Sequence, residues 1–108
     1  MGARGPIKRL DNMQERLDLG RRLELIRHYM EMTQTKFAGQ AGLGLTTYNN
    51  YVQGKKRISL DVAWALCEEY DLSLDYIYRG DPSNLPLDLR SYVRRKLSGP
   101  TGSGQSNL

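Results

Sequence analysis

The spacing of apolar residues along the chain predicts helices. Leu19, Leu23, Ile26 and Met30 follow one another at intervals of four, three and four residues. This spacing places them on one face of a first helix, which could begin further upstream. No stretch alternates apolar and polar positions like a β-strand for more than a few residues. The pattern therefore predicts an all-α fold.

Residues that favour helix ends divide the rest of the chain into short helices. A serine or threonine hydroxyl can accept from an unpaired amide of the first turn, and glycine can take the positive φ that ends a helix. Further helices are expected over 34–41, over 45–53, after Ser59 and over 74–79. A sixth, opened by Pro86, would carry Leu89, Val93 and Leu97 on one side. The expected boundaries are the caps Thr33, Ser59 and Ser73 and the terminators Gly42, Gly54 and Gly80.

The second and third helices have the composition of a helix-turn-helix. That motif needs two short helices crossing steeply at a tight turn. Ala38 is small where the helices would approach, and Gly42 permits the turn. The residues expected to pack the pair are Phe37, Leu43, Tyr48 and Tyr51. The remaining face of the third helix is uncharged and consists of Leu45, Thr46, Thr47, Asn49, Asn50 and Gln53. All of these except Leu45 have groups that can hydrogen-bond to base edges.

Charge is distributed unevenly along the chain, whose net charge is +4. Residues 34–58 contain four basic side chains and no acidic one, whereas residues 59–89 contain seven acids against Arg79 alone. Residues 90–108 are basic again. An acid-free stretch that coincides with the motif predicts a surface that faces phosphates.

Composition argues against several other classes of protein. A single cysteine and a single histidine provide neither a disulfide nor a zinc cluster, which fits a reducing cytoplasm. The longest apolar run, residues 62–67, is far shorter than a membrane span, and the first residues do not resemble a secretory signal. No nucleophile–base pair or phosphate-binding loop suggests an enzyme. We expect no catalytic residue, no metal and no cofactor.

The segment from about Leu17 to Asp81 resembles the phage-repressor-like (Cro-type, also called XRE-type) helix-turn-helix family. The matching elements are Thr33-Gln34, Phe37-Ala38, Ala41-Gly42-Leu43, Tyr48, Tyr51, Gly54-Lys55, Leu72-Ser73-Leu74-Asp75 and Gly80. The resemblance implies a compact, lambda-repressor-like bundle of about five helices, with a sixth C-terminal helix as an addition.

The resemblance also implies roles for individual residues. Gln34 would bind a phosphate and brace the recognition helix, while residues 53–57 would meet the opposite backbone. The expected base contacts are Leu45, Thr46, Thr47, Asn49 and Asn50. The expected phosphate contacts are Thr33, Gln34, Lys36, Gln53, Lys55, Lys56 and Arg57.

Two positions depart from the family pattern. Val52 stands where many members have a glutamate that pairs with an arginine of the first helix. Arg27 is therefore expected to lack that partner and to point to solvent or toward DNA. Gly44 replaces the usual serine or threonine cap, which predicts a third helix that is less firmly held.

The resulting hypothesis is a sequence-specific transcriptional regulator, a repressor, that binds double-stranded DNA at a palindromic operator as a homodimer. Residues 1–16 would form a basic N-terminal arm or helix extension containing Arg4, Lys8 and Arg9, and residues 17–81 the DNA-binding domain. Residues 82–97 would form a C-terminal helix that docks on its own domain, mediates dimerisation or touches DNA, with dimerisation as the preferred role. Residues 98–108 would form a disordered tail. The alternative is an antitoxin that represses its own gene and holds a protein partner through residues 82–108.

Overall fold

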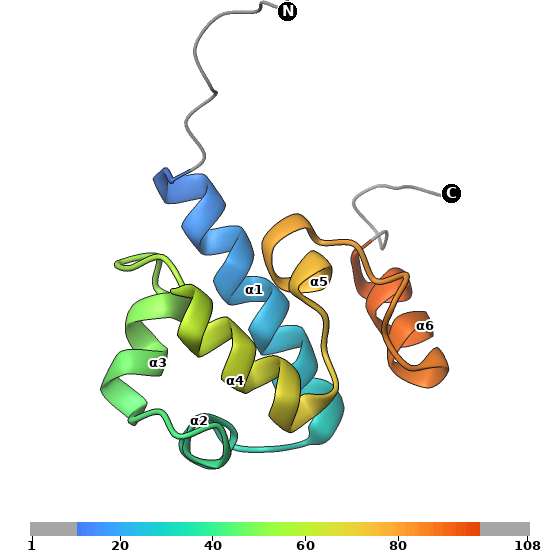
Figure 1. Ribbon diagram of the computed structural model, residues 1–108, viewed down its shortest axis with the longest axis horizontal. Helices are drawn as coiled ribbons and strands as arrows, with labels where there is room; N and C mark the ends of the chain where they lie inside the picture. The colour runs from blue at the N-terminus through green and yellow to red at the C-terminus, as the bar shows by residue number, and fades with distance from the viewer. Residues whose placement is uncertain (1–10, 98–108) are drawn as a thin grey trace, which may run out of the picture.

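The computed structural model describes residues 11–97, and the regular structure in this range is entirely helical (Figure 1). Its helices are α1 (Met13–Met30), α2 (Gln34–Gln40), α3 (Leu45–Val52), α4 (Leu60–Tyr70), α5 (Leu74–Arg79) and α6 (Leu87–Leu97). The all-α prediction is confirmed, and α1 does begin upstream, behind the cap Asn12. The predicted N-terminal arm and C-terminal tail fall largely outside the described residues.

The predicted helix boundaries are confirmed by their hydrogen bonds and backbone angles. The side chains of Thr33, Ser59 and Ser73 each accept from a backbone amide three residues further on. Gly42, between α2 and α3, has a φ of +83°, which an L side chain rarely adopts. The tight turn of the motif therefore depends on this glycine.

The core of the bundle lies around α1. Leu19, Leu23 and Ile26 of α1 are almost fully buried. Leu89 and Val93 of α6 belong to the same hydrophobic core, so α6 docks on its own domain, the first of the three roles considered for it. Figure 1 shows α3 and α6 on opposite sides of α1.

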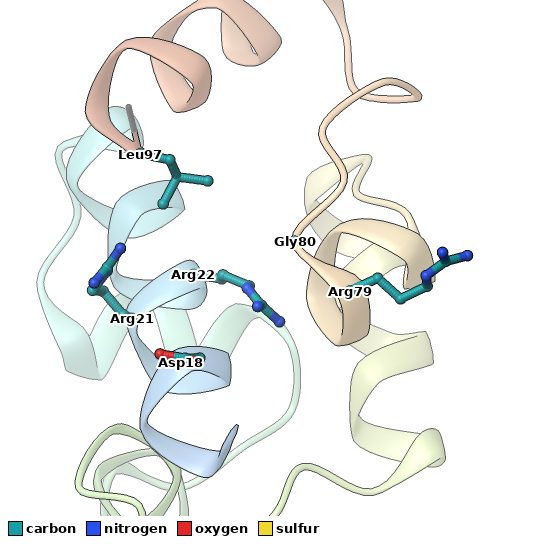
Figure 2. A pocket seen from close by; sticks show the side chains of 6 residues that line it. All are labelled: Asp18, Arg21, Arg22, Arg79, Gly80 and Leu97. Carbon is teal, nitrogen blue, oxygen red and sulfur yellow. The ribbon is translucent and has the colours of Figure 1, made fainter. Parts of the chain in front are cut away.

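Arg22 of α1 fastens α5 to the bundle. Its Nη1 donates to the carbonyl of Ile77 at 2.8 Å, and the hydroxyl of Tyr76 donates back to the Arg22 carbonyl at 2.6 Å. In Figure 2, the Arg22 side chain points from α1 toward Gly80, while Arg21 and Arg79 point away from it. The hollow between these residues is therefore not a convergent arginine cluster.

At Gly20, the backbone of α1 lies directly against the backbone of α3. A Cβ atom added there would lie 2.7 Å from the carbonyl oxygen of Tyr51 and 2.8 Å from the Cα of Val52. Both contacts are to backbone, which cannot rotate away as a side chain can. Only glycine fits at this position of α1 without moving α3.

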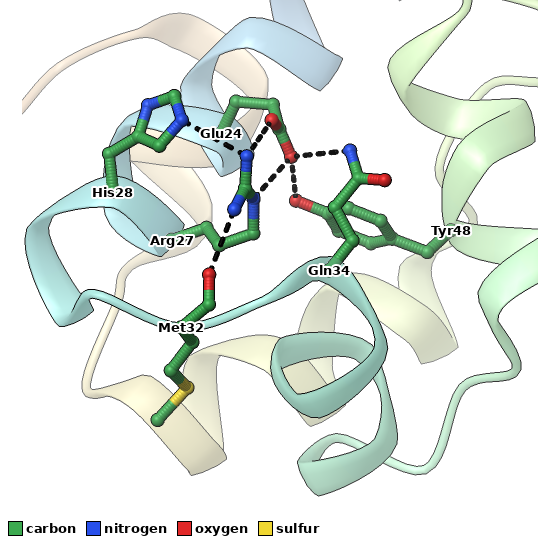
Figure 3. Close-up of polar contacts among 6 residues, drawn as sticks. All are labelled: Glu24, Arg27, His28, Met32, Gln34 and Tyr48. Carbon is green, nitrogen blue, oxygen red and sulfur yellow. Dashed lines mark hydrogen bonds and ion pairs between the residues drawn. The ribbon is translucent and has the colours of Figure 1, made fainter.

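A network of polar side chains joins α1 to α3 beside this contact (Figure 3). The Glu24 carboxylate accepts from the hydroxyl of Tyr48 at 2.6 Å and from Arg27 Nη2 at 2.7 Å. Burial raises the pKa of Glu24, but the hydrogen bonds from Arg27 and Tyr48 outweigh it and hold that pKa below its ordinary value. Burial and the same carboxylate raise the pKa of Tyr48 far above its usual range. The charged carboxylate therefore anchors the inner face of α3.

The expectation that Arg27 points to solvent or toward DNA is wrong. Arg27 pairs with Glu24, one turn earlier in the same helix, and its Nη1 donates to the carbonyl of Met32 at 2.8 Å. His28 Nε2 lies 3.0 Å from Arg27 Nη2. The side chain of Arg27 is only 16% exposed. Val52 cannot pair with Arg27, and Glu24 of α1 takes that role instead.

Replacing Gly20 with alanine should lower the free energy of unfolding by about 1–3 kcal/mol, because the new methyl group would collide with the backbone of α3. Gly39→Ala is the matched control: Gly39 is also helical, and a Cβ there meets nothing within 4 Å. That control should be neutral or stabilising by up to about 1 kcal/mol. Urea unfolding followed by circular dichroism measures both. Equal effects at the two glycines would contradict the close approach.

Replacing Glu24 with glutamine should lower the free energy of unfolding near neutral pH by about 1–3 kcal/mol, because Arg27 and Tyr48 lose a charged acceptor. The pKa of Glu24 is lowered from 4.5 in the folded state. Its stabilisation is therefore present above that value and is lost as the pH falls through the folded-state pKa.

Urea titrations at decreasing pH should show the difference between wild type and Glu24→Gln shrinking in acid. Glu69→Gln, which changes an exposed glutamate of α4, is the control. A penalty for Glu24→Gln that is the same at every pH would argue against the charged anchor.

Candidate nucleic-acid interface

The outward face of α3 carries the residues predicted to contact bases. Tyr48 and Tyr51 face the core and are at most 6% exposed, which confirms their predicted packing role. At 100° per residue, Thr46, Asn49 and Asn50 then lie on the opposite side. Thr46 is exposed, the two asparagines are partly exposed, and Leu45 is 41% exposed. The face thus presents amide and hydroxyl groups with one apolar side chain at its start, and Thr47 lies at its edge.

No side chain caps the start of α3. Gly44 occupies the N-cap position without a side-chain hydrogen bond, as its lack of a side chain predicts. The far end is better held, because the carbonyl of Asn50 accepts from the amides of Lys55 and Lys56 at 2.8 and 3.3 Å. These bonds tie the loop after α3 to the helix itself.

Arg16 of α1 holds the same loop from the other side. Its Nη1 donates to the carbonyls of Gly54 and Lys55 at 3.2 and 3.3 Å, and its Nε lies 3.1 Å from Asp11. Arg16 is a functional residue that was not predicted from the sequence. The contact joins residues 38 and 39 positions apart, and nothing in the local spacing indicates it. Arg16 positions the backbone beside Lys55 and leaves the lysine side chain exposed.

Gln34 stands at the first position of α2, beside the Glu24 network. Its Nε2 lies 3.4 Å from Glu24 Oε2, and that carboxylate in turn holds Tyr48 of α3 (Figure 3). The second Nε2 hydrogen stays available to another acceptor. The hydroxyl of the neighbouring Thr33 already accepts from the amide of Lys36 as the cap of α2.

The basic residues of the acid-free segment (34–58) differ in their exposure and in whether they already have a partner within the protein. Lys36, Lys55 and Lys56 are exposed, and so is Gln53. Arg57, by contrast, pairs with Glu15 at 3.0 Å and lies over the ring of Tyr78, with its guanidinium carbon 5.2 Å from the ring centroid. Arg57 therefore supports the fold between α1 and α5 and is the least free of the predicted phosphate contacts.

The acidic side chains of α1 that reach this surface are neutralised. Glu15 pairs with Arg57, and Glu24 pairs with Arg27. Their charges therefore oppose only weakly the attraction of a polyanion to the three exposed lysines.

Residues 11–97 contain no group of three or more histidine, cysteine or acidic side chains arranged to hold a metal ion. Among the helices in that range, none has the length and apolar character needed to cross a membrane.

Comparison with known proteins identifies one family. The family model described as helix-turn-helix matches residues 26–77, from the second half of α1 to α5. Neither curated proteins nor solved structures give a match. The matched range contains α2, its glycine turn and α3, the elements whose geometry is described above. Residues 26–77 therefore carry a helix-turn-helix of the phage-repressor-like, XRE type, which supports a DNA-binding transcription regulator.

Proposed function

We propose that this protein is a repressor that binds a palindromic operator as a homodimer in the cytoplasm, with α3 in the major groove. The observation that carries the proposal is the outward face of α3. This face is uncharged, rich in hydrogen-bonding groups and set in a segment without acidic residues. A charge-free helix face cannot bind DNA through phosphate attraction alone, so it is suited to reading base edges, while the surrounding lysines supply affinity.

Each part of the surface has its own task in this proposal. Asn50 and Asn49 pair with bases, most simply with adenine, while Leu45 and Thr46 present methyl groups to thymine. Gln34 at the start of α2 and Lys55 after α3 lie at opposite ends of the motif and bind phosphates on either side of the groove. Thr47, Thr33, Lys36, Gln53 and Lys56 add contacts at the edges, and Arg57 adds the weakest because Glu15 already holds it.

The antitoxin hypothesis uses the same DNA-binding surface and differs only in residues 82–108. Within the described part of this region, α6 directs Leu89 and Val93 into its own core. The helix α6, whose last turn is basic, lies on the side of α1 away from α3 (Figure 1). The apolar stripe of α6 is thus already used by its own core, so the repressor is the function that we propose.

Selection of bound DNA from a random library tests the proposal directly. A palindromic consensus with half-sites about one DNA turn apart is expected. Failure to enrich any sequence would overturn the proposed function.

Replacing Asn50 with alanine should weaken binding to the selected DNA by about 1–3 kcal/mol and leave binding to random DNA nearly unchanged, because only a base contact is lost. Fluorescence anisotropy with both DNAs measures the two affinities. Asn84→Ala, at an exposed asparagine before α6, is the matched control and should change neither. An equal loss on both DNAs would remove Asn50 from sequence reading.

Replacing Lys55 with alanine should weaken binding to every DNA and reduce the slope of log affinity against log salt by about 1, because one counterion fewer is released. Lys96→Ala removes the same charge from α6, on the far side of α1, and should leave the slope unchanged. The measurement is anisotropy across a series of salt concentrations. If both variants shift the slope alike, the effect reflects net charge and Lys55 is not a phosphate contact.

A further inference from the structure

One flank of α4 exposes two large apolar side chains that the fold does not use. Leu60 and Trp64 lie four residues apart, on the same side of the helix, and each is 58% exposed. Trp64 is the single tryptophan of the chain. Contiguous exposed apolar side chains, tryptophan above all, are typical of contact surfaces between proteins. We refer to Leu60 and Trp64 as the α4 patch.

The charges around the α4 patch are arranged in order along the helix. Lys55 and Lys56 lie in the loop just before α4, and they and the helix dipole make the N-terminal end of the patch positive, although Asp61 of the first turn offsets one of the two lysine charges. Glu68 lies four residues beyond Trp64 on the same flank and is exposed. The patch therefore has a positive end and a negative end.

We propose that the α4 patch is the contact surface for a second copy of this chain. If two α4 helices pack antiparallel across a two-fold axis near residue 62, Leu60 of each copy meets Trp64 of the other. The same register brings Glu68 to the N-terminal end of the other α4, near its lysines. The acidic end of each patch then lies against the basic end of the other patch. The patch is therefore complementary to itself, as a two-fold contact requires.

A second copy fits this surface better than an unrelated partner because of where the patch lies. Leu60 begins α4 only eight residues after Val52 ends α3. A two-fold axis at the patch would relate the two copies of α3 by the same symmetry that relates the half-sites of a palindromic operator. This step rests on the proposed function. The other candidate element, α6, has its apolar stripe buried in its own core.

The single tryptophan reports the contact without any label and without DNA. As the concentration of the full-length chain rises, its emission should shift to the blue, in step with dimerisation followed by sedimentation. Leu60→Ala should raise the dimer dissociation constant on the order of tenfold. Leu87→Ala removes an equally large side chain that is 66% exposed on α6, and it should leave dimerisation unchanged.

The charge arrangement has its own test. Glu68→Lys should weaken the dimer, because it places like charges together at both ends of the contact. Glu69→Lys makes the same change one residue further, roughly 100° round the helix and off the patch, and should have little effect. A chain that stays monomeric, a dimer whose tryptophan emission does not shift, or equal effects at the two glutamates would each overturn the proposal.

The two proposals can fail separately. Fluorescence and sedimentation contain no DNA, whereas selection from a random library does not depend on where the chains meet. Dimerisation through the α4 patch without enrichment of any DNA would uphold the contact and overturn the repressor. Enrichment of a palindrome by a protein whose dimer leaves Trp64 exposed would do the reverse.

Discussion

The placement of α3 depends on its close approach to α1 at Gly20, where no side chain can separate the two backbones. On its own, α3 could not hold its position. It has eight residues, far fewer than an isolated helix needs for stability in water, and its N-cap is a glycine that forms no side-chain bond. Packing against α1 must therefore supply the order that the helix itself lacks. The bond from Tyr48 to Glu24 then fixes how α3 is rotated about its own axis.

The same helix that positions α3 also positions what surrounds it. Arg16, near the start of α1, holds the loop after α3, and Arg22, one turn and a half further, holds α5. Glu15 and Glu24 each pair with an arginine, Arg57 and Arg27 respectively. As a result, α1 contributes little net charge to the surface beside α3, and the exposed lysines set its sign. The helix α1 thus both holds the segments around the candidate interface in place and leaves its charge to the exposed lysines.

Much of this frame could be predicted from the sequence because it depends on local rules. Caps such as Thr33 and terminators such as Gly42 act within a single turn, and the inward tyrosines follow from helical spacing. The misreading of Arg27 has a different origin. The sequence shows that a family partner is missing at position 52, but it does not show which neighbouring acid replaces it. Glu24 was available at a spacing of three, yet only the position of Tyr48 makes that carboxylate the anchor.

Gly20 and Arg16 could not be predicted in the same way, because their roles depend on segments more than thirty residues away. An isolated glycine inside a helical pattern is the one signal that would have pointed to Gly20, since such a residue usually has a packing reason. The outward face of α3 was recognised from its composition, but which of its groups touch DNA remains a prediction. Composition identifies the face, whereas contacts depend on the partner.

The replacement of an ion pair between helices by one within α1 has a consequence for how this surface can vary. With Val52 in place of a glutamate, α3 contributes no charged residue to the frame, and its inner face packs through Tyr48, Tyr51, Val52 and the backbone beside Gly20. The side chains on the outward face therefore do not hold α3 in place. Substitutions there change what the helix can contact without disturbing the network that holds it. The chain thus separates the residues that place the helix from the residues proposed to meet DNA.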